Sequence, residues 1–316
     1  MTQFTIGCDP EIFLKKRSGP ISAHGLIKGT KKEPHPCAGG AYQVDGMAVE
    51  FNTNPVPVRD FNAFNANIVL VMKNLKEAVL ASEPNATFSL TSVMDFDKEV
   101  LDAQPDEAKE LGCDPDYNAY TGEPNPRPDG EVPFRTAAGH IHVGWGADIP
   151  VDHPDHLEIC CDFVKTLDAT VGMFMTAIED DPRRRELYGK AGAFRPKPYG
   201  VEYRTPSNVW LTTVTRRRCL HGILNWAINT SMNAGGKWDI SKANYFSTEY
   251  IRSAKGVDSV LTDGRIDPRK VIDTGNKAVA IEIVDYFMYR YVDYDSARAW
   301  KTVLSSIRNE EKKKAA

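Results

Sequence analysis

Residues 183–204 read RRRELYGKAGAFRPKPYGVEYR, a basic stretch that ends in alternating apolar and polar residues. The alternation predicts that VEYRT is a β-strand, in which side chains two residues apart share one face. Glu202 and Arg204 are therefore expected side by side. A carboxylate and a guanidinium approached by further basic residues suit a site that holds metal ions with phosphate, because carboxylate oxygens bind Mg²⁺ and arginine contacts phosphate through two bonds. An ion pair at the edge of a strand is the alternative interpretation.

Three other strand-like segments place possible ligands on one face in the same way. They carry Asp9 and Glu11 in GCDPEIF, Glu50 and Asn52 in VEFNT with Asp45 just upstream, and His140 and His142 in GHIHVG. Buried charges at this density are stable only when they bind metal ions or pair with one another. Oxygen ligands with one or two histidines favour Mg²⁺ or Mn²⁺ over Zn²⁺. Each motif alone also fits an ordinary turn or hairpin, so only the ordered set is specific.

The order of predicted elements indicates an α+β fold with a mostly antiparallel sheet flanked by helices. Strands are expected at about 4–16, 42–55, 86–94, 137–146 and 201–205, and helices at about 60–82 with an Asp60 N-cap, 154–179, 214–233, 240–254, 267–273, 282–290 and 294–311. The early strands have hairpin-like or irregular links rather than regular βαβ units. Residues 103–135, which are polar and contain six prolines, are expected to form a functional loop. We predict one catalytic domain over 1–308, helical from about 214, and a charged tail over 309–316.

Composition narrows the possible functions. The formal net charge is −4 over 316 residues, so no overall attraction to nucleic acid or anionic membrane is expected. No apolar run approaches the roughly 18 residues that span a bilayer. Six cysteines without a CxxC pair are typical of reduced thiols, and no secretory signal is visible, which together predict a cytoplasmic protein. Neither a P-loop nor a GxGxxG motif is present, so any phosphate must be bound by arginines and metal ions.

Taken in order, these motifs resemble the phage-type carboxylate–amine ligase (amidoligase) type 2 family, within the glutamine synthetase and glutamate–cysteine ligase superfamily. The motifs are GCDPEIFL, GTKKEPHP, DGMAVEFN, GHIHVG and YGKAGAFRPKPYGVEYRTPSNVW. The resemblance implies a curved antiparallel sheet that holds ATP and Mg²⁺. It also implies that Glu11, Glu50, His140 and Glu202, together with Asp9, His142 and Asp45, are metal ligands. Asp9-Pro-Glu11 stands where many relatives have Glu-x-Glu, so the number of metal ions stays open.

The same resemblance implies roles for the basic residues and a reaction. Arg204 would contact the γ-phosphate or an acyl phosphate, while Arg195, Arg185 and Lys197 would neutralise phosphates or orient the carboxylate. Arg183 and Arg184 are taken as solvated. A substrate carboxylate would attack ATP to give an acyl phosphate, which an amine would then convert to an amide, with Asp45 or an acid in the 103–135 loop as the candidate base. The substrates would be a small molecule, peptide or protein.

Two other functions remain open at this stage. One is a phosphotransferase on the same fold, and the other is a non-catalytic phage protein that binds metal or nucleotide. The sequence gives neither the substrates nor the oligomeric state.

Overall fold

The computed structural model describes residues 4–109, 116–126, 132–145, 151–179, 181–231, 256–262 and 265–315. Its main feature is an 11-stranded sheet in which each pair of neighbouring strands is antiparallel. In spatial order the main path is β3 (His35–Cys37), β4 (Gly40–Asp45), β5 (Ala48–Thr53), β1 (Thr5–Lys16), β11 (Gly139–Gly144), β13 (Gly200–Tyr203), β12 (Ala193–Lys197) and β9 (Tyr117–Asn118). The predicted α+β class with a mostly antiparallel sheet is confirmed.

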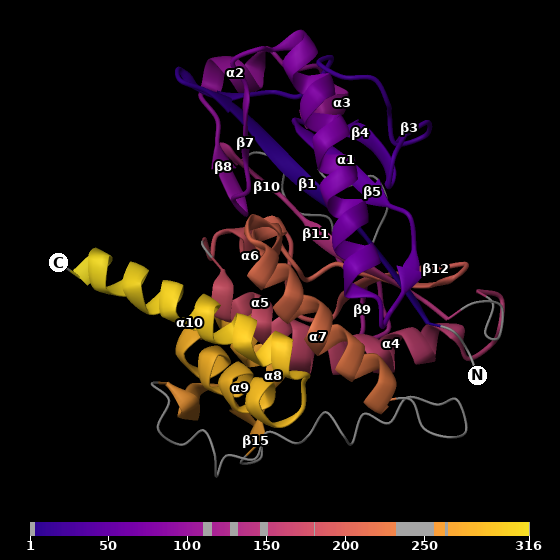
Figure 1. The fold of residues 1–316 in the computed structure, drawn as a ribbon, viewed down its shortest axis with the longest axis vertical. Coiled ribbons are helices and arrows are strands. Elements are labelled where there is room, and N and C mark those ends of the chain that lie inside the picture. Colours follow the sequence, from indigo (N-terminus) through magenta and orange to yellow (C-terminus); the bar gives the residue numbers. More distant parts are fainter. Residues whose placement is uncertain are drawn as a thin grey trace.

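Shorter strands complete the structure. β2 (Gly19–Ile21), β6 (Val56–Pro57) and β7 (Thr87–Ser89) pair with β1. Two further sheets have two strands each. One pairs β8 (Val93–Asp95) with β10 (Phe134–Thr136), and the other pairs β14 (Leu261–Thr262) with β15 (Arg265–Ile266). The long strand β1 therefore organises the sheet, as Figure 1 shows.

Alternation along β1 separates an apolar face from a polar one. Ile6, Cys8, Ile12 and Leu14 belong to the main hydrophobic core, which also contains the buried side of helix α1 (Phe61–Ser82). The Asp60 side chain accepts a hydrogen bond from the Ala63 N–H at 2.9 Å, which confirms the predicted N-cap. Because α1 covers this face of the sheet, the odd-numbered side chains of β1 point to the opposite face.

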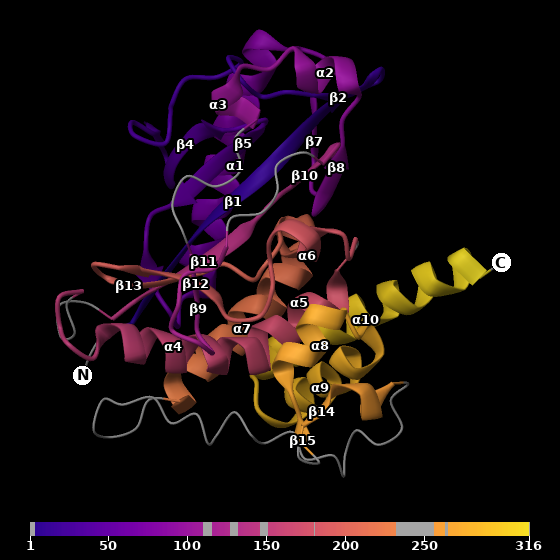
Figure 2. The same cartoon turned by 180° about the vertical axis from the view of Figure 1, so that it is seen from behind.

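A second layer of helices packs below the sheet end formed by β11–β13 (Figures 1 and 2). It contains α4 (His156–Leu167), the π-helical turn η2 (Asp168–Gly172), α5 (Met173–Ile178), α7 (Val214–Ser231), α8 (Pro268–Thr274), α9 (Lys277–Arg290) and α10 (Tyr294–Ala315). Short helices are α2 (Lys98–Asp102), α3 (Asp106–Lys109) and α6 (Arg184–Leu187), with 3-10 turns η3 (Asn208–Thr212) and η5 (Val257–Val260). Within the described ranges, no helix has both the length and the apolar character needed to cross a membrane.

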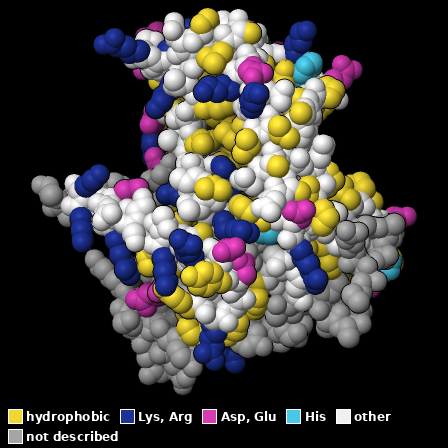
Figure 3. All heavy atoms as spheres, viewed as in Figure 1, with side chains coloured by type: hydrophobic (Ala, Val, Ile, Leu, Met, Phe, Trp, Pro, Cys, Tyr) yellow, Lys and Arg dark blue, Asp and Glu magenta, His cyan; other side chains and the backbone are white. Residues whose placement is uncertain are grey.

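Most predicted elements agree with the structure, with specific differences. The expectation of a plain loop over 103–135 is wrong in part, because α3, β9 and part of β10 lie within it. The strand predicted over 86–94 is two short strands, β7 and β8, and α9 begins earlier than predicted. The predicted helix over 240–254 lies outside the described residues. Residues 309–315 continue α10. Acidic and basic side chains are interspersed over the described part of the face shown in Figure 3.

Candidate active site

The strand register brings the four predicted motifs together on the polar face of the sheet. Three cross-strand pairings do this: Glu11 with Glu50, Asp9 with His140, and His142 with Glu202. On the far side of β13, Arg195 pairs with Glu202. Arg204 continues the pairing beyond β13, because its N–H donates to the Ala193 carbonyl. The predicted same-face placement is confirmed for Asp9 with Glu11, for His140 with His142, and for Glu202 with Arg204.

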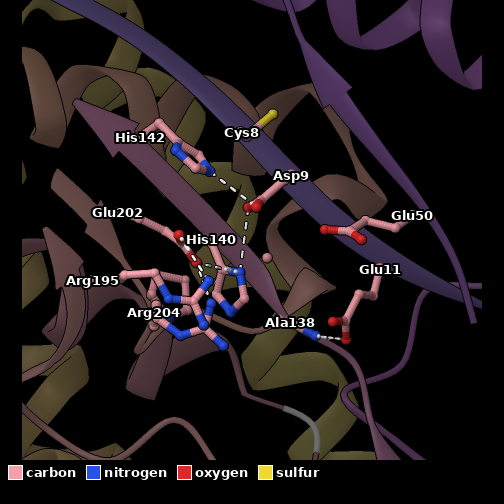
Figure 4. A network of polar contacts seen from close by, with 12 residues as sticks. Cys8, Asp9, Glu11, Glu50, Ala138, His140, His142, Arg195, Glu202 and Arg204 are labelled. Carbon is pink, nitrogen blue, oxygen red and sulfur yellow. Dashed lines mark hydrogen bonds and ion pairs between the residues drawn. The ribbon is translucent and has the colours of Figure 1, made fainter. Parts of the chain in front are cut away.

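Asp9 lies between the two histidines of β11 (Figure 4). Its carboxylate oxygens are 3.3 Å from His140 Nδ1 and 3.0 Å from His142 Nε2. Burial opposes ionisation of Asp9, but the imidazoles hold the pKa of this carboxyl well below its usual range. Burial and the nearby Arg204 lower the pKa of His140, whereas the Asp9 carboxylate raises the pKa of His142 against the effect of burial. His142 Nδ1 also contacts the Tyr199 hydroxyl.

Glu202 is surrounded by cations. Its side chain is 1% exposed, and its oxygens lie 2.7 Å from Lys197 Nζ and 3.4 Å from an Arg195 terminal nitrogen. Arg204 donates to the other Glu202 oxygen. Burial and Asp9 would raise the pKa of Glu202, but Arg204 and the two histidines lower it to about 2. The carboxylate is therefore ionised, and three cations contact it directly.

The opposite end of the polar sheet face is rich in carboxylates. Glu50 is 7% exposed, and its Oε2 accepts a hydrogen bond from Gln43 at 2.7 Å. Burial and the carboxylates of Asp9, Asp45 and Glu11 raise the pKa of Glu50 well above its ordinary value. Burial and Asp45 likewise raise the pKa of Glu11 to about 7, although Glu11 Oε2 accepts from the Ala138 N–H at 2.8 Å. Negative charge is thus incompletely compensated here.

A cavity of about 320 Å³ joins the two ends. Its walls include nine of the eleven predicted site residues: Asp9, Glu11, Asp45, Glu50, His140, Arg195, Lys197, Glu202 and Arg204. His142 is not among the lining residues, but its Nε2 contacts the carboxylate of Asp9, which is. Arg185 is not in the lining; its guanidinium pairs with Glu179.

Several lining residues were not predicted. The polar ones among them include Lys31, Gln43, Asp116, Arg135, Arg184 and Tyr188. Asp116 lies 3.6 Å from Arg204 Nε and comes from the proline-rich segment, and Lys31 pairs with Asp45 at 2.8 Å. Arg184, which was expected to be solvated, is 1% exposed, because its guanidinium donates to the carbonyls of Ala137, Thr205 and Pro206.

The donor set fits a divalent cation. One ligand atom each from Asp9, His142 and Glu202 lie within 4.8 Å of one another. These buried groups contact one another, with His140 Nδ1 at 3.3 Å and His142 Nε2 at 3.0 Å from the Asp9 carboxylate. Several ligand atoms that converge in this way are what a metal site requires.

The sheet and this cavity define an α+β protein with a candidate metal- and anion-binding site. Residues 130–245 match the family described as phage phiEco32-like COOH.NH2 ligase-type 2. The resemblance to this family is confirmed over those residues, which include the strands that carry His140, Arg195 and Glu202, and also Arg204 just after β13. No curated protein matches the chain.

Proposed function

We propose that this protein is an ATP-dependent carboxylate–amine ligase that works through an acyl phosphate and releases ADP. The observation that carries the proposal is the distribution of charge in one cavity. Three cations converge on Glu202 at one end, and Glu11, Glu50 and Asp45 crowd the other. A nucleotide phosphate chain with bound Mg²⁺ would complement both ends, since phosphate matches the guanidiniums and a cation matches the carboxylates.

The chain supplies positioning and electrostatics for phosphoryl transfer. Arg204 and Arg195 would hold transferring phosphate oxygens in a buried setting, where such contacts are stronger than in water. Lys197 would add a third positive charge. The Glu202 carboxylate forms ion pairs with all three of these cations and so holds their nitrogens close together. This arrangement would stabilise negative charge that develops as the substrate carboxylate attacks the γ-phosphate.

The metal would be held by oxygen and imidazole ligands. Asp9, His142 and Glu202, whose ligand atoms lie within 4.8 Å of one another, would bind it together with His140, Glu11 and Glu50, and the number of ions stays open. When bound, the divalent cation would neutralise phosphate oxygens during transfer. Asp45, paired with Lys31 at the carboxylate end, is our candidate to accept a proton from the attacking amine. The sheet would then be of the glutamine synthetase and glutamate–cysteine ligase type, and the enzyme would act in the cytoplasm.

Hydroxylamine provides the test, because it converts an acyl phosphate to a hydroxamate without knowledge of the natural amine. Purified protein would be incubated with MgATP, hydroxylamine and a panel of carboxylic acids, and ADP and hydroxamate would be measured together. We expect equal amounts of both from wild type and neither from Glu202→Ala. ADP with a phosphorylated product that resists hydroxylamine would indicate a phosphotransferase. Nucleotide binding without turnover over the whole panel would refute catalysis.

A further inference from the structure

The cavity extends beyond the residues used above, toward an apolar wall. Asp9, Glu11 and Phe13 follow one another on the cavity face of β1, so Phe13 lies about 13 Å along the strand from Asp9. Phe13, Met47 and Ala48 line this end and are nearly fully buried. They pack in a small hydrophobic cluster with Phe96 and Ala137, which is separate from the main core.

Arg135 is a buried cation of the cavity lining, and it pairs across β10 and β8 with Met94, which packs against this apolar cluster. It is 8% exposed, and one terminal nitrogen donates to the carbonyls of Val132 and Phe134 at 3.0 and 2.9 Å. These bonds fix the guanidinium but leave its Nε buried without a hydrogen-bond partner. In the described segments, no carboxylate forms an ion pair with Arg135. Burying a guanidinium that has an unpaired N–H donor costs free energy, unless a ligand accepts a hydrogen bond from it.

Two further groups make this part of the cavity attractive to an anion. Arg184 adds a second buried positive charge, and its hydrogen bonds all go to uncharged backbone carbonyls. Tyr188 also lines the cavity, and its hydroxyl is buried without a partner. By contrast, Arg195, Lys197 and Arg204 already contact Glu202. The described residues therefore contain two differently built groups of cations in one cavity.

We propose that Arg135 and Tyr188, beside Arg184, form a second anion subsite that binds a carboxylate attached to an apolar segment. The apolar segment would lie on Phe13, Met47 and Ala48. The acid that is ligated would then be a dicarboxylate, with one carboxylate at Arg204 and the other at Arg135. Assigning the anion to the acid rests on the proposed function, whereas anion binding at Arg135 does not. A nucleotide phosphate offers similar chemistry, so the experiment separates the two sources.

Isothermal titration with the full chain tests the subsite. The probes are linear dicarboxylates from succinate to sebacate, the monocarboxylates of matching length, and a non-hydrolysable ATP analogue, all with Mg²⁺. Variants are Arg135→Gln, Arg135→Lys and Tyr188→Phe, with Arg17→Gln as the control at an exposed arginine. We expect at least one dicarboxylate to bind wild type about tenfold more tightly than its monocarboxylate, as a hydrogen bond to a charged group predicts. Arg135→Gln should remove that advantage and Arg135→Lys should restore part of it.

Each result of this titration either supports or overturns the proposed subsite. Tyr188→Phe removes only a hydroxyl and should reduce the advantage several-fold, so it decides the matter if Arg135→Gln fails to fold. Analogue affinity should not change in any variant. The proposal is overturned if dicarboxylates bind wild type no better than monocarboxylates. It is also overturned if the Arg135 variants weaken only the analogue, which would place a nucleotide phosphate there. If a dicarboxylate binds more tightly than its monocarboxylate but no hydroxamate forms, the subsite is supported and the proposed ligase activity is refuted.

Discussion

Replacing Glu11 by glutamine should stabilise the protein at alkaline pH when divalent cations are absent. Burial and the Asp45 carboxylate raise the pKa of Glu11 from 4.5 to about 7. Because the folded-state pKa is raised, the associated stability is present below pH 4.5 and is lost as pH rises through 7. At about 1.4 kcal/mol for each pH unit, ionisation costs about 3 kcal/mol at pH 8 and about 1 kcal/mol at pH 5. Glutamine removes this cost and keeps an oxygen to accept from the Ala138 N–H.

Thermal unfolding measures the effect. An unfolding entropy of about 2.1 cal/mol/K per residue makes 3 kcal/mol equivalent to a rise of about 5 °C for a chain of this length. Melting would be followed in EDTA at pH 5 and pH 8, then repeated with Mg²⁺. Glu11→Gln should gain at pH 8, gain little at pH 5, and lose part of the stabilisation that Mg²⁺ gives wild type. The control is Glu77→Gln, whose carboxylate on α1 is 66% exposed. A lower melting temperature at pH 8 in EDTA, or an unchanged response to Mg²⁺, would refute the reasoning.

Three further predictions concern the site and the core. Arg204→Lys should lower the rate of hydroxamate formation about 100-fold, because lysine lacks the planar fork that contacts two oxygens; normal turnover would contradict the role given to Arg204. His140→Ala should abolish turnover while circular dichroism stays unchanged, and retained activity would remove His140 from the ligand set. Burial against Phe61 and Phe64 lowers the pKa of His221 to about 4. Stability should therefore fall by up to about 3 kcal/mol as pH drops from about 6.5 through 4, and urea unfolding should show a shallower fall for His221→Phe.

The sequence predicts the central strands because their faces differ so sharply. In β1 the even-numbered residues enter the core and the odd-numbered ones face the cavity, so a period of two is visible directly. The strand β12 was missed for the opposite reason. Its sequence AFRPK contains a proline and two cations and shows no clean alternation. It is extended because β13 and β9 pair with it on both sides, which is a tertiary effect.

Arg184 was missed in the site for a different reason. Arg184 and Arg185 are adjacent in the short helix α6, where four residues give no readable period. Only the tertiary structure decides that Arg184 enters the cavity wall and Arg185 turns to Glu179. Gly189 has φ of +78°, and a Cβ there would lie 1.6 Å from an Arg184 terminal nitrogen. The glycine thus makes room for the buried guanidinium, a relation that the spacing alone does not reveal.

The cavity concentrates carboxylates at one end and cations at the other. Glu11 and Glu50 crowd one another and keep raised pKa values, while Glu202 contacts three cations. Neither end can neutralise the other, because the strand register fixes their positions on the sheet. Without a ligand the arrangement costs stability, since like charges are held together in a buried setting. A cation at one end and an anion at the other would relieve both costs at once. We therefore attribute the charge arrangement to ligand binding rather than to folding.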